Sequence, residues 1–571
     1  MALAVPRVVL HGGNAGVALP QPLMPSEAAR VRRIFALQAQ GNIPAALRAT
    51  DEMQDPLLLG SILADRYIGR WYRSTVDDLS GWLARYPDLP DAPAIRSLLL
   101  RRDPKAAVPP AANDAAMVRI FPATPVPEDT DPPHQDIARN AVLDRAVQER
   151  AQRGNQAAAL RLIAGTPGLL PAYAAQLRAE VAQVLFTRNQ DEEALRIAAA
   201  SLRQTPADAQ VGLTAYIGGL AAWRLGHPDQ ARILFEESAR AAIAPPSQRA
   251  ASAFWAARAS RATRDAVGTV HWLRKAAEER RTFHGLLARR MLGLDTGIIP
   301  SGDLVAEADV DAIAATPQGW RAFALLQVGQ TDRAEAEFRA LWPNVQSDRA
   351  LGRSLLLVAS GCGLTNFAAD LAALLQAADG RPHDELRFPV PRLRPASGFR
   401  VDPALIYALT RLESNFNTGA VSAAGARGLM QIMPGTAQYM AGNVALTEDR
   451  LHDPAFNLEL GQRYVRYLAN QEGIGGDLMR LLASYNSGPG SFLRWNAALR
   501  DDDDPLLFIE AIPNAETRAF VPHALTYTWI YAARLHLPAP SLDALAAGAF
   551  PRFTPLTQER TMAALEVPRL H

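Results

Sequence analysis

Cysteine and lysine are the residues that this sequence has least of. Its 571 residues include one cysteine, Cys362, and only two lysines, Lys105 and Lys275. A single thiol excludes an internal disulfide and argues against a cysteine-based metal site. No histidine pattern near Cys362 supports a catalytic thiol. The 59 Lys+Arg balance the 58 Asp+Glu, and a net charge of +1 does not favour nucleic acid or an anionic membrane as a partner.

Long hydrophobic runs are also missing. No apolar stretch reaches the roughly 18 residues of a membrane span. The N-terminal segment "MALAVPRVVLHGGNAG" lacks both the basic start and the long apolar centre of a signal peptide. Two alternatives therefore stay open: an intracellular protein, or an exported one whose leader lies outside this sequence. An apolar share of 49% with 20% charged residues is ordinary for a globular protein.

The length predicts roughly three or four domains, or one extended array of repeats. Eight prolines between Pro104 and Pro133 rule out a regular helix there. A second proline-rich stretch, "GRPHDELRFPVPRLRPASGFRVDP", ends a long helical region. We predict five segments: a helical segment at 25–102, a proline-rich linker at 103–136, a superhelical repeat domain at 137–384, a second domain at 385–545 and a C-terminal tail at 546–571.

A turn residue followed five positions later by alanine recurs along the helical regions. The pairs are Gly41/Ala46, Gly154/Ala159, Asn189/Ala194, Gly226/Ala231, Arg261/Ala266 and Gly329/Ala334. The spacing is close to the 34 residues of helix-turn-helix repeats of the tetratricopeptide kind. A turn residue ends the first helix, and a small residue in the second lets the two backbones pack closely. The pattern therefore predicts an all-α superhelix of helical hairpins, the alternative being coincidence in an alanine-rich chain.

Glu413 is the candidate catalytic residue. Asp402 and Pro403 are typical of a helix start, and Glu413 lies four residues after Leu409, at the edge of an apolar stripe. A carboxyl group beside apolar side chains has a raised pKa and can act as a general acid. The alternative is a solvated glutamate at a helix end, and spacing alone does not decide between them.

The segment that follows, "GAVSAAGARGLMQIMPGTA", resembles part of a ligand groove. Gly425 and Gly428 permit a tight backbone path and close approach of a ligand. The amide of Gln431 can donate and accept hydrogen bonds, as sugar hydroxyls and acetamido groups require. Met430 and Met433 would ordinarily be core residues.

Three motifs together resemble the soluble lytic transglycosylases, which cleave peptidoglycan with a lysozyme-like catalytic domain. They are "ESNFN…SAAGARGLMQIMPGTA", "ASYNSGPG" at 483–490 and "EAIPNAETRAFV" at 510–521. The resemblance covers about 385–535 and extends more weakly to the helical array, where "FHGLLARRMLG" at 283–293 is similar to the end of the family's superhelix. It implies a mainly all-α protein, with an N-terminal α-superhelix followed by the lysozyme-like domain.

The resemblance implies a role for eight residues. Glu413 would be the single catalytic acid and base, and seven others would line the substrate groove: Ser414, Ser422, Gln431, Met433, Tyr485, Asn486 and Glu516. Tyr485 could instead be a buried aromatic with a satisfied hydroxyl, and Glu516 could be an ion-pair partner of Arg518 or a helix cap. The sequence departs from the family pattern at Ser484 and Ser487, where alanine is more usual, and at Phe520, where tyrosine is common.

The reaction implied is non-hydrolytic cleavage of the MurNAc-β-1,4-GlcNAc bond to 1,6-anhydro ends. The partner would be peptidoglycan glycan strands, in the periplasm, with no metal or organic cofactor, no nucleic acid and no membrane span. No partner enzyme of the cell wall can be named. One alternative is a muramidase that uses water and a second carboxylate, for which the sequence offers Asp449, Asp453, Glu459 and Asp477. The other is a glycan-binding scaffold that does not cut.

Overall fold

The computed structural model describes residues 7–9, 18–108, 137–298, 305–391, 393–442 and 446–556. Most of the predicted linker at 103–136 and most of the predicted C-terminal tail lie outside the described residues. The chain divides into two compact units, in which Met1–Pro125 groups with Pro300–Pro389, and Val126–Ile299 groups with Val390–Arg569. The bounds of the five segments expected from composition stay predictions. None of the helices formed by the described residues is long and apolar enough to cross a lipid bilayer.

The first unit joins two helical segments that are far apart in the sequence. Its elements are β1 (Arg7–Val9), β2 (Ala18–Pro20), α1 (Pro25–Ala39), α2 (Ile43–Asp51), α3 (Leu59–Ile68), α4 (Val76–Arg85), α5 (Ala92–Arg102), α16 (Glu307–Ala314), α17 (Pro317–Gln327), α18 (Thr331–Arg339), α19 (Trp342–Ser347), α20 (Arg349–Gly361), α21 (Thr365–Asp379) and α22 (Asp384–Arg387). β1 and β2 pair as a short antiparallel ribbon. One hydrophobic core contains side chains of α1 and α3 together with those of α16–α21, so the two segments bury each other's apolar faces.

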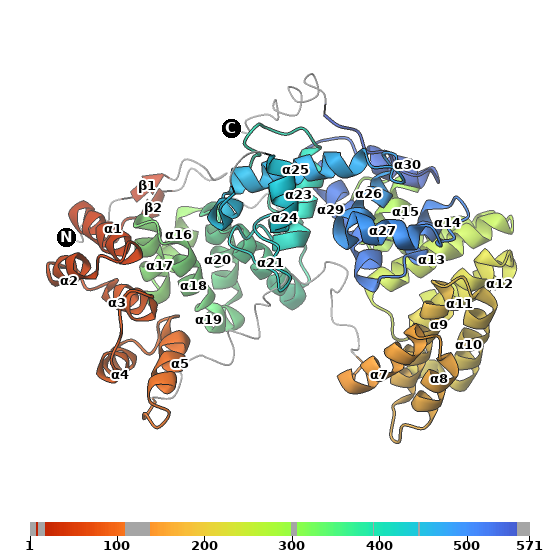
Figure 1. The fold of residues 1–571 in the computed structure, drawn as a ribbon, viewed down its shortest axis with the longest axis horizontal. Helices are drawn as coiled ribbons and strands as arrows, with labels where there is room; N and C mark the ends of the chain where they lie inside the picture. Colours follow the sequence, from red (N-terminus) through yellow and green to blue (C-terminus); the bar gives the residue numbers. More distant parts are fainter. Residues whose placement is uncertain are drawn as a thin grey trace. The chain divides into compact units, whose positions relative to one another are not determined.

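The second unit begins with a series of helical hairpins, drawn on the right of Figure 1. Its helices are α7 (Ala141–Gln152), α8 (Gln156–Ala164), α9 (Pro171–Phe186), α10 (Asp191–Gln204), η2 (Ala207–Ala209), α11 (Gly212–Arg224), α12 (Pro228–Ala239), α13 (Pro246–Ala262), α14 (Ala266–Glu278) and α15 (Phe283–Met291). Successive helices from α9 to α15 pack against one another. The predicted superhelix of helical hairpins is therefore present.

Five of the six predicted turn pairs are confirmed. Their turn residues have positive φ, and the paired alanines are 0% exposed: Gly41/Ala46, Gly154/Ala159, Asn189/Ala194, Gly226/Ala231 and Gly329/Ala334. The pair Arg261/Ala266 was wrong. In that hairpin the residue with positive φ is Arg264, and Ala266 is exposed as the first residue of α14. Helix α13 runs to Ala262, so the turn comes three residues later than the pattern indicated.

The rest of the second unit holds the residues of chemical interest. Its helices are α23 (Pro403–Ser414), α24 (Pro434–Ala441), η3 (Glu448–His452), α25 (Pro454–Ala469), α26 (Leu478–Ser487), α27 (Pro489–Asn496), α28 (Pro505–Ala511), α29 (Ala515–Arg534) and α30 (Pro540–Ala546). α23 packs along α29, and α26 packs on the same helix. The long α29 is thus the support on which the helix that carries Glu413 rests.

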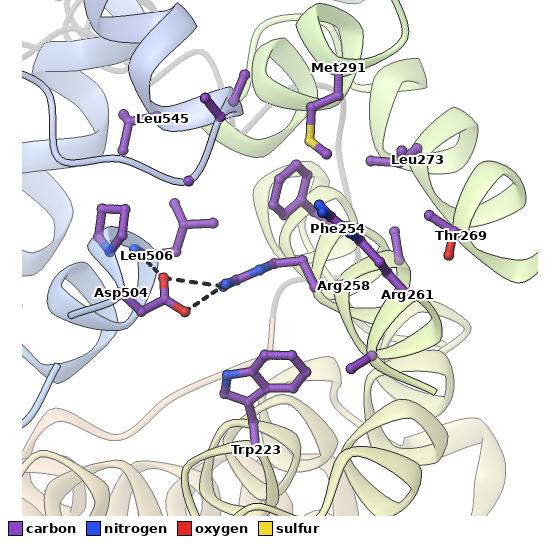
Figure 2. Close-up of a pocket in the computed structure, with 16 residues that line it drawn as sticks. Trp223, Phe254, Arg258, Arg261, Thr269, Leu273, Met291, Asp504, Leu506 and Leu545 are labelled. Atoms are coloured by element: carbon purple, nitrogen blue, oxygen red, sulfur yellow. Dashed lines mark hydrogen bonds and ion pairs between the residues drawn. The ribbon is translucent and has the colours of Figure 1, made fainter. Parts of the chain in front are cut away.

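The superhelix holds this part of the unit through α28 and the turn before it. Figure 2 shows Arg258 of α13 reaching the carboxylate of Asp504, and the two form an ion pair at 2.6 Å. Asp504 also caps α28 by accepting hydrogen bonds from the backbone N–H groups of Leu506 and Leu507. At the other end of α28, Tyr216 donates a 2.6 Å hydrogen bond to Glu510. Both ends of the helix that leads into α29 are therefore fixed by side chains of the superhelix.

Candidate active site

Helix α23 places Glu413 one residue before its end. Asp402 caps the start by accepting a 2.8 Å hydrogen bond from the N–H of Ala404. The helix stops because Asn415 and Phe416 both adopt positive φ, at 47° and 61°. Residues 403–411 are buried, whereas Glu413 is part-exposed. The carboxyl group therefore emerges where a buried helix reaches the surface.

The environment of Glu413 favours its protonated form. Burial raises the pKa of Glu413 from 4.5 to about 8, and the negative charge of Glu516 adds to the effect. Among the described residues, no group forms a hydrogen bond or an ion pair with the carboxyl group of Glu413. With a pKa raised to about 8, its carboxyl group keeps its proton near pH 7.

Tyr485, on α26, lies beside Glu413. Its pKa is raised well above 10, first by burial and then by the charge of Glu413. The hydroxyl donates its proton to the carbonyl of Met430 at 2.8 Å, so it has only acceptor capacity left for Glu413 or a ligand. The ring of Tyr485 is 5.5 Å from that of Tyr464 and lies parallel to that of Phe520 at 6.3 Å. The carbonyl of Met430 thus fixes the hydroxyl of Tyr485 against the loop.

The loop after α23 folds back onto the end of that helix. Ser414 donates from its hydroxyl to the carbonyl of Leu429 at 2.7 Å and contacts the carbonyl of Thr410 at 3.1 Å. Single bridges pair Arg427 with Val421 and with Ile432. Ser414 was predicted to bind substrate, and this stays a prediction: its hydroxyl proton is directed to the loop, whereas the oxygen can still accept a hydrogen bond. The geometry gives it the role of tying helix to loop.

The glycine at 428 is needed for packing inside the protein. Its φ is +72°, and a Cβ there would lie 2.3 Å from the carbonyl oxygen of Leu451 and 2.4 Å from the amide of Asn457. Gly425 has φ of +89°, but a Cβ there would meet nothing within 4 Å. Gly428 thus allows the loop to approach α25 closely, whereas Gly425 supplies only a backbone conformation.

Three predicted groove residues lie on this loop and have different surroundings. The amide nitrogen of Gln431 donates to the carbonyls of Gly428 and Ala420, at 2.9 and 3.3 Å. Its carbonyl oxygen accepts no hydrogen bond from the part of the chain that the structure describes. The hydroxyl of Ser422 accepts from the N–H of Ala426 at 3.0 Å and so closes the loop. Met433 is 43% exposed just before α24, so it is not a core residue as methionines usually are.

Asn486 and Glu516 meet across α26 and α29. The amide of Asn486 donates to Glu516 at 3.2 Å and accepts from the hydroxyl of Thr517 at 2.6 Å. Glu516 is exposed in the first turn of α29. The alternative ion pair with Arg518 is absent from the described residues, because Arg518 instead donates to the carbonyl of Ile512 at 2.6 Å.

Most of the other candidate carboxylates have structural roles. Asp453 caps α25 by accepting from the N–H of Phe456 at 2.7 Å. Asp477 caps α26 and lies 3.5 Å from Arg480. Glu459 is 4% exposed and accepts hydrogen bonds from Gln462 and Arg463. Asp449 is exposed in η3. Among the described residues, the carboxylate whose charge raises the pKa of Glu413 is that of Glu516.

Asn457 is a residue of this site that the sequence did not indicate. This residue is fully buried in α25, where its amide donates to the carbonyls of Arg427 and Leu451 and accepts from the N–H of Met430. It therefore holds the loop segment that carries Gln431. The sequence offered one signal, a polar residue on a predicted helix. Many polar residues on helices are exposed, so this signal does not single out Asn457.

Part of this chain is similar in sequence to known proteins. The family model described as Transglycosylase SLT domain matches residues 393–507. A stretch of 157 residues is 34% identical to the soluble lytic murein transglycosylase of Escherichia coli K12, covering 26% of this chain and 24% of that protein. A stretch of 109 residues is 38% identical to the membrane-bound lytic murein transglycosylase C of Haemophilus influenzae, covering 17% of this chain and 30% of that protein. The matches thus span about a quarter to a third of these relatives.

Two solved structures share the fold over most of the chain. The 70 kDa soluble lytic transglycosylase of Escherichia coli has a TM-score of 0.52 and 18% identity, and the match covers 93% of this chain and 100% of that one. An inactive mutant of the lytic transglycosylase Slt of Pseudomonas aeruginosa has a TM-score of 0.54 and 20% identity, with 93% and 89% covered. At these identities the likeness establishes the architecture, an α-superhelix with a lysozyme-like domain.

Proposed function

Because this chain carries a transglycosylase SLT domain and belongs to the soluble lytic transglycosylase family, we propose that it is a peptidoglycan lytic transglycosylase. Its substrate is the MurNAc-β-1,4-GlcNAc bond of glycan strands, and its place of action is the periplasm, where that substrate lies. One observation supports this most: Glu413 has a pKa raised to about 8 at the edge of an apolar helix. Such a group can protonate a leaving oxygen at neutral pH.

The first step is proton transfer from Glu413 to the glycosidic oxygen. The bond between C1 of the muramic residue and that oxygen breaks, and the GlcNAc side leaves with a hydroxyl group. The 2-acetamido oxygen of the substrate stabilises the positive charge that develops at C1. The carbonyl oxygen of Gln431 can accept from a sugar hydroxyl or acetamido N–H, and the exposed Met433 offers apolar surface beside it.

The second step returns the proton to the enzyme. The carboxylate of Glu413 takes the proton from the C6 hydroxyl of the same muramic residue, and that oxygen bonds to C1 to give the 1,6-anhydro ring. No water is consumed, and Glu413 is regenerated as an acid. Because the nucleophile belongs to the substrate, correct positioning can contribute several kcal/mol, part of the roughly 7–11 kcal/mol that intramolecularity can supply. Tyr485 accepts a hydrogen bond in the groove, and Asn486 holds Glu516.

Glu516 supports a second candidate function. A muramidase of the same fold needs a second carboxylate to activate water, and Glu516 is the carboxylate whose charge acts on Glu413. Its hydrogen bond from Asn486 and its exposure on the first turn of α29 are compatible with that role. The two functions differ in their products.

Purified sacculi digested with the protein separate these functions. We expect mass spectrometry to find muropeptides with anhydro ends, 18 Da lighter than the hydrolysis products because no water is added. Reducing ends would identify a muramidase, and binding without release of products would identify a scaffold. Glu413→Gln should lower the rate at least about a hundredfold, and full activity in that variant would refute the assignment of Glu413.

A further inference from the structure

A cluster of arginines and aromatic residues at the end of α3 has no part in the reaction proposed above. The segment "RYIGRWYR" covers residues 66–73. It borders a cavity of about 320 Å³ in the first unit, together with residues of α1 and Gln330 at the start of α18. That volume lies at the lower end of the roughly 300–1,000 Å³ of small-molecule sites.

Arg66 brings a buried positive charge to this cavity. The residue is 4% exposed, and its guanidinium donates to Gln38 at 2.8 Å and to Thr50 at 2.5 Å, both neutral acceptors. Among the described residues no carboxylate forms an ion pair with it. Asp65, which also lines the cavity, instead pairs with Arg333 at 3.1 Å. A buried cation without a direct counter-charge is costly, and a bound anion would offset that cost.

Trp71 supplies an aromatic surface at the mouth of the cavity. Its side chain is 51% exposed. Gly41 has φ of +78°, and a Cβ there would lie 2.9 Å from the indole, so the ring rests directly on the backbone of the α1–α2 turn. The guanidinium of Arg70 lies 4.5 Å from the ring centre. The indole is therefore held in place beside a second positive charge.

We propose that this cavity is a second glycan-binding site, which takes a sugar ring bearing a peptide with a free carboxylate. The carboxylate accepts paired hydrogen bonds from the guanidinium of Arg70. It also accepts one from Nη1 of Arg66, whose Nε and Nη2 already donate to Gln38 and Thr50. The sugar ring contacts the indole of Trp71 through its C–H groups, and the amide of Gln330 serves its polar substituents. The choice of a muropeptide as ligand rests on the proposed function. The site belongs to the first unit, whereas Glu413 belongs to the second.

Fluorine NMR of the full chain labelled with 5-fluorotryptophan reads this site directly. The protein has nine tryptophans, so the resonance of Trp71 must be assigned. It is the resonance that is missing from the spectrum of the Trp71→Phe variant. We expect muramyl dipeptide, which has a free carboxylate and is not a substrate for cleavage, to shift the Trp71 resonance in a saturable way. Arg70→Ala should weaken that binding at least fivefold. Ile68→Ala is the matched control, since Ile68 is 44% exposed two residues before Arg70 but does not line the cavity.

Three outcomes would overturn the proposal. A Trp71 resonance that does not move with muramyl dipeptide removes the site. If inorganic phosphate shifts the Trp71 resonance as much as muramyl dipeptide does, the cavity is an unselective anion site. If the dipeptide without its sugar binds as tightly as muramyl dipeptide, Trp71 does not contact a sugar ring. Digestion of sacculi by the unlabelled protein is scored separately. A failure of cleavage with an intact Trp71 titration refutes only the proposed function, and the reverse result refutes only this site.

Discussion

Glu516 accepts a 3.2 Å hydrogen bond from Asn486, and its charge is the second cause, after burial, of the raised pKa of Glu413. The two carboxyl groups are thus electrostatically coupled. Glu413 is part-exposed at the end of α23, and Glu516 is exposed in the first turn of α29. This coupling can be tested by changing either residue.

Glu516→Gln should move the alkaline limb of the pH–activity profile to lower pH. The proposed first step needs protonated Glu413, so activity falls as the pH rises through the pKa of that group. Removing the charge of Glu516 lowers this pKa, but not to 4.5, since burial is the larger cause. The measurement is the rate of sacculus digestion between pH 5 and 9. Asp449→Asn changes an exposed acid in η3 and is the control, which should leave the alkaline limb in place. A shift of the limb to higher pH in Glu516→Gln would contradict the electrostatic coupling of Glu516 to Glu413.

Glu413→Gln should stabilise the protein, and the gain should depend on pH. The pKa of Glu413 is about 8 in the folded state against a model value of 4.5. The folded state therefore holds a proton that the unfolded state has lost, so this group's contribution to stability falls as the pH rises from about 4.5 to about 8. Glutamine is neutral throughout and escapes this loss. The melting temperature of the variant should exceed that of the parent by an amount that grows over this range and is constant above it.

The exposed residue Glu472 provides the comparison for that experiment. Glu472→Gln should track the parent across the whole pH range. A constant offset between Glu413→Gln and the parent from pH 4 to 9 would mean that the carboxyl group is not desolvated in the folded state, and the acid role would lose its physical basis.

Gly428→Ala and Gly425→Ala form a matched pair, since both glycines have positive φ. Each alanine is strained by about 1–2 kcal/mol for its backbone alone. At 428 the new methyl group would also lie 2.3 Å from the carbonyl of Leu451 and 2.4 Å from Asn457, whereas at 425 it meets nothing within 4 Å. We expect Gly428→Ala to lower the melting temperature well below that of Gly425→Ala and to lose most activity. Equal effects at the two positions would show that the loop does not depend on its packing against α25.

The features that were predicted correctly from the sequence are those that depend on local pattern. Turn residues with positive φ and small residues in the next helix follow from local geometry, which is why five of the six hairpins are correctly placed. The error at Arg261 arose because helix α13 continues to Ala262 through residues that a helix accepts easily. Glu413 was identified because its position on the helix and the adjacent motif agree.

Long-range pairing was not visible in the sequence. Nothing in the pattern of α1 or α3 indicates that they share a core with α16–α21, since an amphipathic helix does not specify its partner. Ser414 was expected to face the substrate, and no pattern indicated that its hydroxyl bonds to Leu429, fifteen positions further along the chain. Asn457 was missed for the same reason, because its three partners belong to a loop and a turn that only the fold brings together.

Ser484→Ala should stabilise the protein. Ser484 is 0% exposed in α26, and no group of the described residues accepts or donates a hydrogen bond at its hydroxyl. Burying an unsatisfied hydroxyl costs about 1–3 kcal/mol, and alanine is also the better helix former. We expect a gain of about 1 kcal/mol, measured as a rise of a few degrees in the melting temperature. Ser487→Ala is the control, because that hydroxyl donates to the carbonyl of Ala483 at 2.7 Å and should gain little. If Ser484→Ala is less stable than Ser487→Ala, the hydroxyl of Ser484 has a partner, such as a bound water, and the departure from alanine at 484 carries a structural benefit.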